Sequence, residues 1–192
     1  MIARMSRLTS HASLFAAACL LAALALAPSA PAQDAPGPLT KSFLGMIDNA
    51  RQNLEQSAEL MPAESYEFRP TPEVRPFGEW IAHTAMSNYG FCSRIKGEPR
   101  PDVAHLEKLK AKPEIAKALR DSFEYCKASF DGLDDQKAMA EVTVGKSKYA
   151  RVDPMLGLVR SLHSHYGTLA VYLRLKNIVP PSTARARQQQ AR

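Results

Sequence analysis

Apolar side chains recur every three or four residues in four separate stretches of the chain, which is the spacing of one face of an α-helix. The stretches cover residues 39–61, 77–95, 113–130 and 153–177. The first stripe contains Phe43, Ile47, Ala50, Leu54, Ala58 and Met61, and the last contains Met155, Leu158, Leu162, Leu169 and Leu173. Because each helix must bury its apolar face against the others, the pattern predicts an all-α four-helix bundle.

Glycine and proline residues mark where these helices should end. Gly97 follows the second helix, and the Pro180-Pro181 pair follows the fourth, as expected for residues that cap or stop helices. The fourth helix has the clearest predicted start, because Asp153 suits the N-cap and Pro154 suits the first helical position.

The connections between the helices differ in length and character. Prolines in residues 66–76 exclude a continuous helix there, and residues 103–109 favour at most a weak helical turn. Before the last helix, the β-prone residues 142–144 are followed by Gly145. That order predicts an irregular segment or a small hairpin.

The first 32 residues have the pattern of an export signal. Arg4 and Arg7 precede an uncharged apolar run at residues 14–27, which is shorter than the roughly 20 residues that span a bilayer. Small residues at 30–32 then supply a cleavage site. We therefore expect residues 1–32 to be a signal peptide, so that the mature protein is periplasmic or secreted and has no transmembrane segment. A retained helical anchor is the alternative.

The rest of the chain divides into a linker at residues 33–38, the bundle at residues 39–181 and a flexible basic tail at residues 182–192. Of the 192 residues, 45% are hydrophobic and 23% are charged, which is ordinary for one globular domain. Without the signal, 23 basic residues face 19 acidic ones, a charge of +4. Three of the positive charges lie in the tail, so the bundle is nearly neutral and specific nucleic-acid binding is not expected.

Two histidines on different predicted helices are the candidates for chemistry. His83 lies in the second helix and His165 in the fourth, and bundles build metal sites from side chains on facing helices. His163 is two positions from His165 and should point to another side of the helix. The spacing alone favours packed, hydrogen-bonded core histidines over metal ligands.

Cys92 and Cys126 are the only cysteines that remain after the signal is removed. An even number of cysteines in an exported chain predicts a disulfide bond between them. Two free, buried thiols are the alternative.

Residues 66–98 and 165–182 resemble the DinB-like superfamily, specifically its exported bacterial members. The likeness is carried by Phe-Arg-Pro-Thr-Pro at 68–72, by the Ala-His pair that ends at His83, and by the His-Tyr-Gly to Pro-Pro stretch that begins at His165. It implies an up-down-down-up four-helix bundle that holds a divalent metal on three histidines.

The resemblance places two of the three metal ligands on this chain. His83 matches the ligand from the second helix, and His165 matches the second member of a His-x-x-x-His pair in the fourth. The first member of that pair falls on Ser161, so the implied site for Zn, Ni or Mn is incomplete.

Three hypotheses about function remain open from the sequence. The first is a metal-dependent transferase or hydrolase of unknown substrate, since the family includes thiol-dependent transferases and isomerases. The alternative, which Ser161 favours, is a non-enzymatic binding or structural bundle in the cell envelope with a degenerate metal site. A small-molecule ligand is an expected partner, and the resemblance implies a homodimer. A third hypothesis is that the arginine-rich tail contacts anionic lipid or nucleic acid at the envelope surface.

Overall fold

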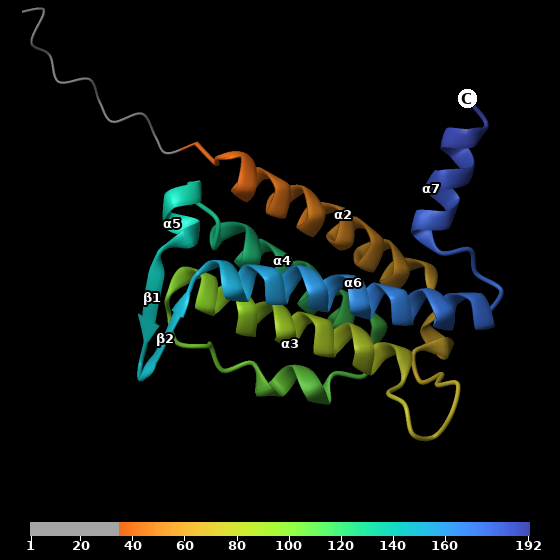
Figure 1. Cartoon of the computed structure of the whole chain (residues 1–192). Helices are drawn as coiled ribbons and strands as arrows, with labels where there is room; N and C mark the ends of the chain where they lie inside the picture. The colour runs from red at the N-terminus through yellow and green to blue at the C-terminus, as the bar shows by residue number, and fades with distance from the viewer. Residues whose placement is uncertain (1–34) are drawn as a thin grey trace, which may run out of the picture. The chain divides into compact units, whose positions relative to one another are not determined.

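Four long helices form the body of the protein: α2 (Pro38–Leu60), α3 (Phe77–Lys96), α4 (Lys112–Ala128) and α6 (Val152–Leu175) (Figure 1). The structure is a computed structural model that describes residues 35–192, so the expected signal peptide lies outside the described residues. Each long helix begins and ends within about two residues of a predicted apolar stretch. The prediction of an all-α four-helix bundle is therefore confirmed.

The core is made by the apolar stripes that the sequence contains. Helix α3 packs against both α4 and α6, and α2 packs mainly against α6. Burying a Leu, Ile, Phe or Met side chain completely stabilises a fold by roughly 1.5–3 kcal/mol. The largest side chains with essentially no exposure are Leu54, Met61, Phe77, Ile81, Ile95, Ile115, Leu119, Met155, Leu158, Leu162, Leu169 and Leu173.

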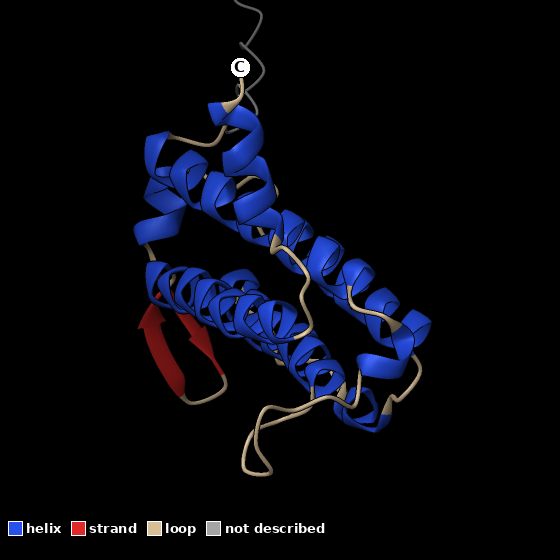
Figure 2. Cartoon of the chain, turned by 90° about the vertical axis from the view of Figure 1, so that its right-hand side faces the viewer, coloured by secondary structure: helices blue, strands red, loops and turns tan. Residues whose placement is uncertain are grey.

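Short elements join the long helices. They are the 3₁₀ helices η1 (Ala63–Ser65) and η2 (Ala104–Lys108), the helix α5 (Asp135–Met139), and the strands β1 (Glu141–Val144) and β2 (Ser147–Ala150). The strands pair antiparallel around Gly145, which has φ 59°, and form the hairpin expected before the last helix (Figure 2). Helix α5 was not predicted. Among residues 35–192, no helix combines the length and apolar character needed to cross a membrane.

The helix ends agree with the sequence at α3 and differ at α6. Gly97 adopts the left-handed conformation at the C-cap of α3, with φ 83°, as predicted. Asp153 does not cap α6, because the helix begins at Val152 and its N-cap position is Arg151. Arg151 is already in the helical region, and its N–H donates to the carbonyl of Ala140. Strand β2 therefore passes directly into the helix without an extended capping residue.

The segment expected to be a flexible basic tail contains the helix α7 (Pro181–Gln190), which the sequence pattern does not predict. Proline at the first helical position and the Ala, Arg and Gln residues that follow favour a helix. Arg185 donates to the side chains of Gln56 and Asn53 on α2. At the start of α7, the Ser182 hydroxyl lies 2.7 Å from the hydroxyl of Tyr166 on α6.

A carboxylate from a distant element caps the start of α2. Asp135 of α5 accepts hydrogen bonds from the backbone N–H groups of Leu39, at 3.0 Å, and Thr40, at 2.8 Å. Gly37 precedes the helix, and a Cβ atom there would collide with the Asp135 carboxylate. Helix α5 thus supplies a cap that residues 35–37 do not provide.

Candidate functional site

The two candidate histidines face each other across the packed helices α3 and α6. The ring centroids of His83 and His165 lie 5.1 Å apart. His165 is buried, with 8% of its surface exposed, whereas His83 is half-buried at the edge of a cavity. The structure therefore brings together the two positions that the sequence singled out.

Thr84 fixes which nitrogen of His165 carries the proton. The Thr84 hydroxyl donates its single proton to the carbonyl of Trp80, at 2.8 Å. Its oxygen also lies 3.1 Å from Nδ1 of His165, so it accepts a hydrogen bond from the N–H group at that nitrogen. The lone pair of neutral His165 is consequently on Nε2, which lies 3.5 Å from the Ser161 hydroxyl oxygen.

Both imidazoles are held neutral by their surroundings. Burial, together with smaller effects of the nearby His83 and Arg75, lowers the pKa of His165 to about 4. Burial also lowers the pKa of His83, with a further lowering by Arg75 and Arg100 that Glu107 opposes. Burial and the nearby guanidinium groups thus both disfavour a protonated imidazole at this site.

Trp80 forms one wall of the site. Its ring centroid lies 5.4 Å from that of His165 and 5.9 Å from that of His83. The indole N–H donates to the Tyr172 hydroxyl at 3.2 Å, and that hydroxyl donates to the carbonyl of Arg75 at 2.7 Å. The Arg75 guanidinium in turn lies 5.3 Å from the Trp80 ring centroid. This chain of contacts ties the loop before α3 to α6.

The side chains present do not fit a three-histidine metal centre. Within residues 35–192, no group of three or more His, Cys, Asp or Glu side chains is arranged to hold a metal ion. The third position holds the Ser161 hydroxyl, which is a poor substitute for the nitrogen, thiolate and carboxylate ligands that zinc prefers. His163 is exposed on α6, and its Nδ1 lies 2.9 Å from the carbonyl of Val159, so it does not replace the missing ligand.

Two adjoining cavities open beside His83, along the side of α3 that faces η2. Their volumes are about 240 and about 400 Å³, and both are lined by Arg75, His83, Met86 and Glu107. Arg94 and Arg100 also line the larger cavity. Thr84 and these arginines were not identified from the sequence. The polar Thr84 at a stripe position of a predicted helix was the one available signal.

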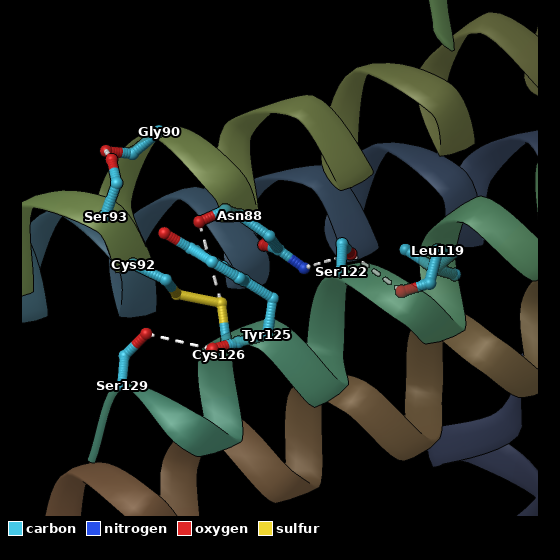
Figure 3. The surroundings of a disulfide bond; sticks show 9 residues. All are labelled: Asn88, Gly90, Cys92, Ser93, Leu119, Ser122, Tyr125, Cys126 and Ser129. Carbon is cyan, nitrogen blue, oxygen red and sulfur yellow. Dashed lines mark hydrogen bonds between the residues drawn. A yellow bond between two sulfur atoms is a disulfide. The ribbon is translucent and has the colours of Figure 1, made fainter. Parts of the chain in front are cut away.

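A disulfide bond joins Cys92 of α3 to Cys126 of α4 (Figure 3). The two Cα atoms are 5.1 Å apart, within the range that a disulfide spans. Both cysteines are buried. Next to the bond, the Asn88 side-chain amide donates to the Ser122 hydroxyl at 3.0 Å. The bond that the sequence predicts is thus present, and it links the two helices at the end opposite Trp80.

Comparison with known proteins gives the family from the sequence and the same fold in solved structures. The family model for the DinB superfamily matches residues 46–168. A DinB-like protein from Bacillus cereus ATCC 10987 superposes with a TM-score of 0.61 and 13% identity, covering 73% of this chain and 95% of that one. A conserved protein from Enterococcus faecalis superposes with a TM-score of 0.57 and 14% identity, covering 71% and 95%. The comparison with curated proteins gave no match.

Proposed function

Because the chain belongs to the DinB superfamily but has a hydroxyl in place of a third ligand, we propose that it is an exported small-molecule-binding protein without a resident metal. One observation carries this proposal: Ser161 stands 3.5 Å from the lone-pair nitrogen of His165. A histidine four residues before His165 would share its helix face. The Ser161 hydroxyl keeps this position polar but is a weak ligand for a metal ion.

The charges around the histidines support the same proposal. Arg75 lowers the pKa of both imidazoles, and Arg100 lowers that of His83, because positive charge disfavours a second positive charge nearby. The same repulsion acts on a divalent cation. Glu107 is the one carboxylate among the causes of the His83 shift, and it offsets this effect only in part.

Metal analysis of the purified, mature protein tests the proposal. We expect far less than one equivalent of Zn, Ni or Mn in the wild type. Ser161→His should raise zinc affinity sharply, because it restores two histidines four residues apart opposite His83. Removing His83 from that variant should abolish the gain, and His163→Ala should change nothing. One equivalent of metal in the wild type, lost in His83→Ala, would refute the proposal.

A second candidate function, a metal-dependent transferase or hydrolase, is favoured by one observation. The hydrogen bond to Thr84 leaves Nε2 of His165 unprotonated, and metal-binding histidines usually donate their other N–H to such a partner. The metal analysis described above separates the two functions, because a metalloenzyme would already hold about one equivalent of metal with serine at position 161.

Export and oligomeric state are parts of the proposal with simple tests. Mass analysis of protein recovered from the periplasm or medium should give a chain that begins at Gln33. Retention of residues 1–32 in that fraction would instead indicate an anchor. The homodimer that the family resemblance implies is checked by sedimentation of the purified protein.

A further inference from the structure

We propose that the larger cavity beside His83 binds a small organic anion, namely a carboxylate or a phosphate monoester on an apolar skeleton. The inference rests on the proposed function, since it names the class of small molecule. The cavity has a volume of about 400 Å³, which is within the range of small-molecule sites in proteins.

Three arginines line this cavity and have no acidic partner in the described part of the chain. Arg75, Arg94 and Arg100 are absent from the ion pairs formed within residues 35–192. Among the described residues that line the cavity, Glu107 is the one carboxylate, so these residues carry an excess of positive charge. Guanidinium groups bind carboxylates and phosphates through paired hydrogen bonds.

Each arginine is exposed and makes a contact that leaves its charge unneutralised. The Arg94 guanidinium lies 4.5 Å from the ring centroid of Tyr149 on the hairpin, and Arg75 lies over Trp80. Arg100 donates to the carbonyl of Met86 at 3.2 Å. Ordering side chains before a ligand arrives reduces the entropy lost on binding.

The remaining wall of the cavity is mixed and favours a ligand with an apolar part. Met86 and Phe91 contribute apolar surface, and Ser87 and His83 contribute polar groups. Gly90 lies beneath Arg100, since a Cβ at this position would be 3.7 Å from the Arg100 Nε. A fully hydrated inorganic ion would leave the apolar surface in contact with water.

Trp80 provides a direct readout of occupancy. It is the one tryptophan of the chain, and it contacts Arg75 and His83, which both line the cavity. We would titrate the EDTA-treated mature protein with benzoate, phenyl phosphate and inorganic phosphate and follow Trp80 fluorescence, with calorimetry as a second measurement. Benzamide is the matched neutral control for benzoate.

The expected result is that benzoate or phenyl phosphate binds at least ten times more tightly than benzamide, and that inorganic phosphate binds more weakly than phenyl phosphate. Arg94→Gln and Arg100→Gln should each weaken binding at least tenfold. Arg120→Gln is the control, because Arg120 pairs with Glu59 at 3.1 Å on the α2–α4 side of the bundle. If a glutamine variant does not fold, Ser87→Glu places a negative charge in the cavity and should also abolish binding.

Three results would overturn the inference: no binding of either aromatic anion, equal binding of benzoate and benzamide, or unchanged affinity in the folded cavity variants. Zinc content measured on the same samples keeps the two proposals apart. A protein that holds zinc but binds benzoate equally after EDTA treatment refutes only the proposed function. A metal-free protein that binds neither benzoate nor phenyl phosphate refutes only the anion site.

Discussion

Replacing Cys92 and Cys126 together by alanine should destabilise the protein strongly without changing its fold. Both sulfur atoms lie in the buried contact between α3 and α4, and the helices pack along each other beyond the bond (Figure 1). The double variant avoids leaving one unpaired thiol. The difference in stability between the wild type and the double variant therefore measures the covalent link together with the loss of the two buried sulfur atoms.

The size of the effect follows from the length of chain that the bond closes. The cysteines are 34 residues apart in sequence, and the chain-entropy relation gives about 3.8 kcal/mol for such a loop at 25 °C. Strain in the native bond would lower this value, so about 2–4 kcal/mol is the expected loss in the free energy of unfolding. For a chain of this length, a loss of 3.8 kcal/mol corresponds to a drop in Tm of roughly 8–15 °C.

Urea denaturation of the oxidised wild type, the reduced wild type and the double variant measures the loss. The reduced wild type and the double variant should unfold at similar midpoints, well below that of the oxidised protein. Because both cysteines are buried in the native state, thiols must be alkylated after unfolding in guanidinium without reductant. Two alkylated cysteines in exported protein, or equal midpoints for all three samples, would refute the reasoning.

Three further changes test the fold and the site. Gly97→Ala should cost at least 1–2 kcal/mol, because it forces a left-handed conformation on alanine and places a Cβ 2.8 Å from Val142; Gly45→Ala, in open space on α2, should be neutral or stabilising in the same denaturation assay. Asp135→Ala should lower the Tm. Hydrogen bonds from the Thr40 and Leu39 N–H groups hold the pKa of Asp135 below its ordinary value of 3.8. The difference in Tm from the wild type should therefore shrink as the pH falls below about 3.8 and the carboxylate is protonated. The buried His165 should stay neutral, since its pKa is lowered to about 4 from 6.5; its contribution to stability is complete above pH 6.5 and is lost as the pH falls towards 4. A His165→Gln variant with the same acid sensitivity as wild type in that interval would contradict this.

Local sequence signals were enough to predict most of the fold. The apolar stripes place α2, α3, α4 and α6 correctly, and Gly97 ends α3 as its type suggests. The errors occur where a residue distant in sequence determines how a helix begins. Asp153 looks like an N-cap, but the chain enters α6 from strand β2 and makes Arg151 the cap. Pairing between β2 and β1 sets this geometry, and the residues around Asp153 do not reveal it.

The candidate site was predictable only as two positions. Helix periodicity places His83 and His165 on facing helices, and the family resemblance identifies Ser161 as the vacant ligand position. Neither pattern shows that Thr84 fixes the tautomer of His165. Likewise, Arg100 enters the site from the connection after α3 and reaches back 14 residues to the carbonyl of Met86.

The bonds from Asp135 to the start of α2 also have a consequence for the order of synthesis. The amide groups of Leu39 and Thr40 are made early, but their acceptor follows 96 and 95 residues later in the chain. Until that residue has been made and brought back, water must satisfy these two donors, so the first turn of α2 frays. Loss of this acceptor alone, in Asp135→Ala, should therefore let proteases cut the chain near Leu39 faster than they cut the wild type.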